Sequence, residues 1–290
     1  LDFNPTCFSH PMADTGFTIS SADDDIRNFW IRHCKASRKI AEYFGKELGQ
    51  PCVTNFWFPD GYKDTPIDRE APRRRMMTAL DEVFAEKIDE KYDLDALESK
   101  VFGIGAESYT VGSNEFCVGY AVSRNKLCCL DAGHFHPTEV ISDKIPSVLL
   151  FTKELLLHVS RPVRWDSDHV IVLDDELCAI AQSLVRTGLI ERTHIGLDFF
   201  DASINRVAAW AVGIRSWERA LLTALCTPSE MLKKLQDENK LTELMVRHEE
   251  VRMLPWGDIW DEYCTRCGVP KDGEWFGEVE KYEKDVLLKR

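Results

Sequence analysis

Carboxylates and imidazoles lie in or just after four successive apolar runs of the sequence. In a parallel β/α barrel the carboxyl ends of the strands share one rim, so these side chains would converge there. Carboxylates at close range repel one another and cannot all stay ionised without a counter-charge, which a divalent cation supplies. The pattern therefore predicts a metal site, with enough candidates for two ions. The candidate ligands are Glu98, Asp131, His134, His158, Asp166, Asp168 and Asp198.

Each of these residues has another interpretation when it is taken alone. An aspartate at a strand end can cap the helix that follows, and His158 inside an apolar run can be a hydrogen-bonded core histidine. Asp166 and Asp168, separated by one serine, are also common in turns. The joint pattern favours the metal, because an acid or an imidazole accompanies each run in turn. Oxygen-rich ligation with one or two imidazoles suits Mn²⁺, Mg²⁺ or Co²⁺, and Zn²⁺ is also compatible.

Other residues could contact a substrate near such a centre. Lys100 stands two positions after Glu98, and on a strand this spacing points both side chains to the same side. An ammonium beside metal ligands would polarise a substrate oxygen; the simpler alternative is an ion pair. Trp57 ends another apolar run and could stack on the apolar face of a sugar, or it could belong to the core. His10 could reach the site or lie in a polar loop.

Strands and helices that alternate along the chain must position these residues. Short apolar runs between longer amphipathic stretches are typical of parallel β/α units, and runs that are apolar throughout indicate a sheet buried on both faces. The sequence contains neither a GxGxxG pattern nor a P-loop, which favours a (β/α)8 barrel over a doubly wound nucleotide-binding sheet. The predicted strands are 1–9, 51–58, 97–104, 126–131, 154–159 and 194–199. The predicted helices are 23–48, 71–88, 177–187, 205–225, 228–252, 256–267 and 273–289.

The strand count falls short of a complete barrel. The sequence shows six candidate strands where a β/α barrel has eight, and it opens inside the first of them. We therefore expect the first strands of the barrel to be missing. We expect residues 1–225 to form the rest of the barrel and residues 226–290 to form a helical extension that contacts other subunits.

Composition argues against several classes of protein. With 36 basic and 49 acidic residues the net charge is −13, whereas nucleic-acid-binding proteins usually present a basic surface. No apolar run reaches the length of a membrane span, and the first residues lack the pattern of a signal peptide. Cys264 and Cys267 have no second pair to complete a zinc site. We expect reduced cysteines, a cytoplasmic protein, and neither nucleic acid nor membrane as a partner.

Five segments together resemble one family, the L-rhamnose isomerases. They are residues 2–11 (DFNPTCFSHP), 103–113 (GIGAESYTVGS), 130–139 (LDAGHFHPTE), 161–169 (RPVRWDSDH) and 196–206 (GLDFFDASINR). The similarity extends over essentially the whole chain. It implies a xylose-isomerase-like (β/α)8 TIM barrel of which this chain is roughly the C-terminal two-thirds, and a homotetramer. It also implies a cytoplasmic, metal-dependent enzyme that interconverts L-rhamnose and L-rhamnulose in L-rhamnose catabolism.

The resemblance implies a part for each candidate residue. Lys100 matches a lysine that faces the reacting carbons, and Trp57 matches a sugar-stacking aromatic. A histidine that helps to open the sugar ring in the family would lie upstream of Leu1. The first metal site, which holds substrate oxygens, corresponds to Glu98, Asp131, His158 and Asp198. The second, catalytic metal site corresponds to His134, Asp166 and Asp168.

These assignments predict an aldose–ketose isomerisation by hydride shift between C1 and C2. The predicted cofactor is two divalent ions, with Mn²⁺ in first place. The predicted catalytic residues are Lys100, Asp166 and His134, and the predicted substrate-binding residues are Trp57, Lys100 and Asp198. A metal-dependent sugar epimerase or a phosphodiester hydrolase on the same barrel is the alternative chemistry. The alternative in which the chain is not an enzyme is an inactive truncated subunit.

Overall fold

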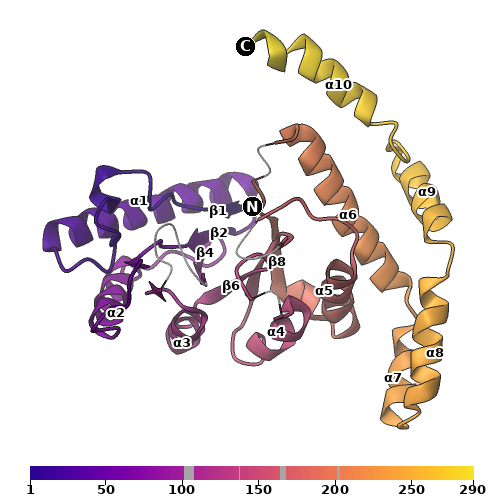
Figure 1. The fold of residues 1–290 in the computed structure, drawn as a ribbon, viewed down its shortest axis with the longest axis horizontal. Coiled ribbons are helices and arrows are strands. Elements are labelled where there is room, and N and C mark those ends of the chain that lie inside the picture. Colours follow the sequence, from indigo (N-terminus) through magenta and orange to yellow (C-terminus); the bar gives the residue numbers. More distant parts are fainter. Residues whose placement is uncertain (101–107, 137, 164–167, 201–202) are drawn as a thin grey trace. The chain divides into compact units, whose positions relative to one another are not determined.

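The chain divides into two compact units in the computed structural model (Figure 1). The structure describes residues 1–290 except 101–107, 137, 164–167 and 201–202. The first unit comprises Leu1–His169 with Ile190–Phe199, and the second comprises Val170–Leu189 with Phe200–Arg290. The boundary between a catalytic barrel at 1–225 and an extension at 226–290 stays a prediction.

The first unit is a nearly closed barrel of parallel strands. The six strands are hydrogen-bonded in the order β1, β2, β4, β6, β7, β8. The sheet is strongly curled, because Asp2 on β1 lies 3.0 Å from His158 on β7 although three strands stand between β1 and β7 in that order. The predicted barrel class is confirmed. The strands are β1 (Asp2–Phe3), β2 (Cys52–Phe56), β4 (Asp93–Glu98), β6 (Leu127–Asp131), β7 (Leu155–Val159) and β8 (Thr193–Leu197).

Helices connect the first five barrel strands. At the start of α1 the carboxylate of Asp23 accepts hydrogen bonds from the backbone N–H groups of Asp25 and Ile26, and Gly49 ends the helix with φ 67°. The segments between strands also contain a short antiparallel pair of strands and two 3₁₀ turns, the second of which lies directly before β8. The helices are α1 (Asp24–Leu48), α2 (Ala71–Val83), α3 (Asn114–Arg124) and α4 (Ile141–Val148). The smaller elements are η1 (Pro11–Ala13), β3 (Gly61–Tyr62), β5 (Tyr109–Thr110) and η2 (Leu189–Arg192).

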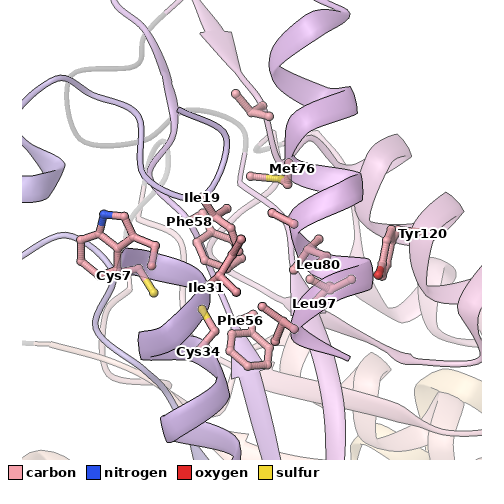
Figure 2. Packing of buried hydrophobic residues seen from close by; sticks show 14 of the residues in the cluster. Cys7, Ile19, Ile31, Cys34, Phe56, Phe58, Met76, Leu80, Leu97 and Tyr120 are labelled. Atoms are coloured by element: carbon pink, nitrogen blue, oxygen red, sulfur yellow. The ribbon is translucent and has the colours of Figure 1, made fainter. Parts of the chain in front are cut away.

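Apolar side chains cover both faces of the barrel strands. On the outer face Phe56 of β2 and Leu97 of β4 pack with Ile31 of α1 and Leu80 of α2 (Figure 2). Because side chains alternate along a strand, the residues of opposite parity face the barrel interior. There they form a second cluster of Val53, Leu94, Ala96, Leu127, Cys129 and Leu156. Burial on both faces explains why most of these strands are apolar throughout.

The second unit consists of helices in the part of it that the structure describes. α5 packs along α6, and α7 packs against α8. Among all described residues, no helix combines the length and the apolar character that a membrane crossing requires. The helices are α5 (Asp175–Arg186), α6 (Arg206–Cys226), α7 (Ser229–Asp237), α8 (Leu241–Arg252), α9 (Trp256–Cys267), α10 (Phe276–Asp285) and the short η3 (Leu287–Lys289).

The structure corrects several predicted boundaries. The strand predicted to begin at residue 97 begins at Asp93 and ends at Glu98, and residues 101–104 of the predicted strand lie outside the described residues. Asp93 and Asp95 hide this strand from a search for apolar runs, yet Asp95 is buried and paired with Arg38 of α1 at 2.7 Å. The helix predicted at 228–252 is two helices, because Asn239 interrupts it with φ 56°. The helix predicted at 71–88 ends earlier, at Val83, and α3 and α4 were not predicted.

Candidate metal centre

The site lies at the carboxyl ends of the barrel strands. Ala96 and Cys129 belong to the interior cluster, so Glu98 and Asp131, each two positions later, also face the interior. His158 occupies the same face of β7. Each of these three residues is the last inward-facing residue of its strand. Because the strands are parallel, they meet at one rim.

The first donor group comprises Glu98, Asp131, His158 and Asp198, which offer ligand atoms that lie within 4.8 Å of one another. The Nδ1 atom of His158 lies 3.6 Å from Glu98 Oε2, 3.7 Å from Asp131 Oδ2 and 3.2 Å from Asp198 Oδ2. Glu98, Asp131 and His158 are buried, whereas Asp198, just after β8, is partly exposed. Three carboxylates and one imidazole around one point are a ligand set that a divalent cation would accept.

The second donor group comprises Asp131, His134 and Asp168. The Nε2 atom of His134 lies 3.5 Å from Asp168 Oδ2 and 3.9 Å from Asp131 Oδ2. Asp131 therefore belongs to both groups, whereas the sequence analysis placed it in the first alone. Asp166, the other predicted ligand of this group, lies outside the described residues.

Buried polar atoms without partners test whether this cluster fits a metal. Among the described residues, Asp131 Oδ2, His158 Nδ1 and Asp168 Oδ1 are buried and make no hydrogen bond of normal geometry. Such atoms are unfavourable unless something binds them. The other oxygen of Asp131 accepts hydrogen bonds from the N–H of Gly133 at 2.6 Å and from Ser160 Oγ at 2.8 Å. One oxygen is thus held in place while the other faces both donor groups, as a shared metal ligand requires.

The electrostatics of the cluster favour a cation. Burial lowers the pKa of His134, but the charges of Asp131 and Glu98 outweigh it and raise this pKa well above its usual value. Burial likewise opposes the charged form of His158, yet Cys129 and Glu98 raise its pKa well above the ordinary range. The field that draws protons to these imidazoles would also attract a divalent ion, which would then replace the protons.

Lys100 and Trp57 lie together beside the second donor group. The Nζ atom of Lys100 lies 3.1 Å from Nε2 of His134 and 4.9 Å from the centre of the Trp57 ring. The rings of Phe8 and Trp57 form a T-shaped pair with their centroids 5.5 Å apart. Lys100 follows β4 rather than extending it, so the predicted strand alternation with Glu98 is not what places it here. The arrangement brings an ammonium held by an aromatic face to the candidate metal-binding cluster.

Some residues around the donors were missed in the sequence analysis. Asp2 lies 3.0 Å from Nε2 of His158, and Asn55 donates a hydrogen bond to Oε2 of Glu98. Burial raises the pKa of Asp2, but the hydrogen bond and the charge of His158 together with other hydrogen bonds lower it to about 2. Gly196 gives the imidazole room, because a Cβ there would lie 3.1 Å from His158 Cδ2. Asp2 and Asn55 are both inward-facing polar residues near strand ends, and this pattern in the sequence could have identified them.

His10 belongs to neither donor group. Its Nδ1 accepts a hydrogen bond from the N–H of Met12 at 3.1 Å, and its ring stacks on Phe29. The structure thus places His10 in a polar loop, which was one of its two predicted positions.

Comparisons with known proteins agree with this geometry. The sequence profile of a family described as L-rhamnose isomerase (RhaA) matches residues 1–290. An L-rhamnose isomerase of Listeria innocua is 61% identical over 290 residues, which are 100% of this chain and 69% of that protein. An L-rhamnose isomerase of Yersinia pseudotuberculosis is 60% identical over the same shares of the two chains.

Solved structures with a similar fold are more distant in sequence. A structure of an L-ribulose 3-epimerase has a TM-score of 0.52 and 14% identity, and the match covers 72% of each chain. A D-psicose 3-epimerase from Clostridium cellulolyticum H10 has a TM-score of 0.50 and 16% identity, with 77% of this chain and 76% of that chain covered. These likenesses support the barrel fold alone. The profile match and the identities show that this chain belongs to the L-rhamnose isomerase family.

Proposed function

We propose that this chain carries the metal centre of an enzyme that isomerises L-rhamnose to L-rhamnulose, a step of L-rhamnose catabolism. The observation that carries the proposal is the pair of donor groups joined by Asp131, with Lys100 beside them. Glu98, Asp131, His158 and Asp198 would hold one divalent ion. Asp131, His134 and Asp168, together with Asp166, would hold another. Mn²⁺ is the ion that we propose first, with Co²⁺, Mg²⁺ and Zn²⁺ compatible with the same oxygen and nitrogen donors.

The chemistry divides between the ions and the side chains. Bound divalent ions act as Lewis acids that polarise a carbonyl oxygen. The ammonium of Lys100 would stabilise negative charge that develops on a substrate oxygen. Trp57 would stack on the apolar face of the sugar and hold Lys100 over its ring. Asp198, the partly exposed member of its group, would face the substrate.

The proposed reaction moves one hydride and one proton. The C2–H bond breaks with its electron pair, which forms the new C–H bond at C1. The hydroxyl on C2 loses its proton and becomes the ketone, while the oxygen on C1 gains a proton. We assign the proton transfer to His134 and to Asp166, which lies outside the described residues.

Deuterium at C2 of L-rhamnose tests this reaction. A hydride shift predicts that the deuterium is retained at C1 of L-rhamnulose. Extensive exchange with solvent would contradict it and favour an enediol formed by a carboxylate base. Identification of the product by chromatography separates isomerisation from epimerisation, the other chemistry expected of a metal-dependent sugar enzyme on this fold.

We also propose a cytoplasmic homotetramer in which residues 226–290 contact other subunits. The second unit exposes apolar side chains on and after α8, with Met245 62% and Met253 84% exposed. Met245, Val246 and Met253 line one surface hollow, and exposed apolar surface of this kind is typical of subunit interfaces. Sedimentation should give a mass about four times the 33.3 kDa of the chain. A monomer at micromolar concentration would contradict the proposal.

A further inference from the structure

The two nitrogens of His158 face different surroundings. Nδ1 points at the carboxylates of the first donor group, with Asp198 Oδ2 nearest at 3.2 Å. Nε2 lies 3.0 Å from Oδ2 of Asp2, at the opposite edge of the ring. The side chain of His158 is fully buried, so its orientation depends on these contacts and on packing. A neutral imidazole carries its proton on one nitrogen only, and the partner of one nitrogen decides what the other can do.

We propose that Asp2 is a positioning residue for the metal centre. The carboxylate of Asp2 accepts the proton of His158 Nε2 and thereby leaves the lone pair of Nδ1 facing the metal position. Carboxylates that hold a ligating histidine in this way orient the ring and raise its basicity as a ligand. The inference rests on the proposed metal centre and extends it to a residue outside both donor groups.

A chain of hydrogen bonds extends this control to a second ligand. Asn4 Nδ2 donates to Oδ2 of Asp2 at 2.8 Å, and Asn55 Nδ2 donates to Oδ1 of Asn4 at 2.9 Å. The same amide of Asn55 donates to Oε2 of Glu98. His158 and Glu98, two ligands from strands β7 and β4, are therefore joined by side chains of β1, β2 and the residue after β1. Displacing Asp2 would disturb both ligands together.

The space around Asp2 supports a specific contact. Both carboxylate oxygens of Asp2 lie 3.4 Å from the place where a Cβ of residue 196 would be, and His158 Cδ2 lies 3.1 Å from it. Glycine at position 196 is what allows the imidazole and the carboxylate to lie against β8. Asp2 also belongs to β1, whose backbone is fixed by parallel pairing with β2. The carboxylate is thus held on a strand rather than on a loop.

Metal affinity provides the first test. The chelator-stripped chain and its Asp2→Asn variant are titrated with Mn²⁺, and free Mn²⁺ is measured by electron paramagnetic resonance. The amide keeps the size of the carboxylate but lacks its charge, so Mn²⁺ binding should weaken by about 10- to 100-fold. Asp93→Asn is the control, because Asp93 is also a strand aspartate, buried where Asp2 is partly exposed, but lies at the opposite end of its strand from Glu98. It should bind Mn²⁺ within about twofold of the parent.

The tautomer of His158 provides a test that needs no Asp2 variant. The chain is labelled with ¹⁵N-histidine and loaded with diamagnetic Zn²⁺, and the His158 signals are identified with His158→Gln. The proposal predicts a proton on Nε2 and a metal-bound Nδ1. A proton on Nδ1, or equal Mn²⁺ affinity in parent and Asp2→Asn, would overturn the part given to Asp2 and leave the metal centre standing. Failure of the parent to bind Mn²⁺ would overturn both.

Discussion

Replacing Asp131 with asparagine removes the carboxylate that belongs to both donor groups. The asparagine keeps an oxygen that can accept the hydrogen bonds from Gly133 and Ser160, so the rim of the barrel should keep its shape. The atom lost is Oδ2, the oxygen that is buried without a hydrogen-bond partner among the described residues. We therefore expect Asp131→Asn to impair metal binding at both positions, whereas Asp198→Asn should impair only the first.

The size of the effect follows from ligand linkage. An ion that binds only the folded chain adds RT ln(1 + [L]/Kd) to the free energy of unfolding, about 2.7 kcal/mol per site at one hundred times Kd. Two occupied sites therefore raise the free energy of unfolding of the parent by about 5 kcal/mol. Asp198→Asn should keep the contribution of one site, and Asp131→Asn should keep little of either. Since 1 kcal/mol shifts Tm by about 2–4 °C in a domain of this size, the two variants should differ by about 5–10 °C in Mn²⁺.

Thermal unfolding followed by circular dichroism measures this difference. Each protein is melted after treatment with chelator and again with excess Mn²⁺, and the shift in Tm is compared. Asp14→Asn, at an exposed position of the same unit, should keep the full shift of the parent. An equal Mn²⁺-induced shift in Asp131→Asn and Asp198→Asn would refute the conclusion that Asp131 serves both donor groups.

Three further substitutions test the roles proposed for Lys100, Gly196 and Asp93. Lys100→Met removes the ammonium but keeps an apolar stem. The rate of L-rhamnulose formation should therefore fall about 10²- to 10³-fold, while the Kd for Mn²⁺ stays unchanged or decreases. A rate equal to that of the parent would contradict the role proposed for Lys100. Gly196→Ala places a Cβ 3.1 Å from His158 Cδ2 and should weaken Mn²⁺ binding about tenfold or more, whereas Gly119→Ala, with open space among the described residues, should bind as the parent does. Burial raises the pKa of the Asp93 carboxyl from 3.8 to about 7. The contribution of the protonated carboxyl to the free energy of unfolding is therefore fully present below about pH 4, and it is lost as the pH rises through 7. Urea unfolding at pH 5 and pH 8 should show a smaller pH dependence in Asp93→Asn than in the parent, and equal dependence would contradict this assignment.

The donor groups could be predicted largely from the sequence because their positions follow from simple rules. Asp131 ends an apolar run and His158 lies inside the next, and parallel strands bring such positions to one rim. The shared position of Asp131 could not be predicted in this way, since it depends on which of its two oxygens is held by Ser160 and Gly133. That choice depends on a contact from the end of the neighbouring strand, at Ser160, as well as on the local contact with Gly133.

The strand at Asp93–Glu98 shows why part of the fold was misplaced. Its outward-facing acids, Asp93 and Asp95, are residue types common in loops. In the fold, Asp95 pairs with Arg38 of α1 and with Lys126, the residue before β6. A tertiary contact thus overrides the local pattern. Helix α4 was missed for a related reason, because its short sequence contains Pro146, which is rarely found inside a helix.

Asp2 and Asn55 were missed because each is one polar residue in a short strand. A strand of two residues such as β1 offers too little alternation to show which side faces the interior. Their importance emerges only when curling of the sheet brings β1 to β7 and a hydrogen bond of 3.0 Å joins Asp2 to His158. The periodicity of the sequence cannot predict such a contact between strands that are far apart in the chain.

The most direct test of the central claim is formation of L-rhamnulose from L-rhamnose by the purified chain. The protein is stripped with a chelator, assayed, and assayed again after addition of Mn²⁺, with bound Mn²⁺ counted in the same sample. We expect two bound ions per chain, and product that appears only when they are present. A chain that binds no Mn²⁺, or one that forms L-rhamnulose equally well after stripping, would contradict it.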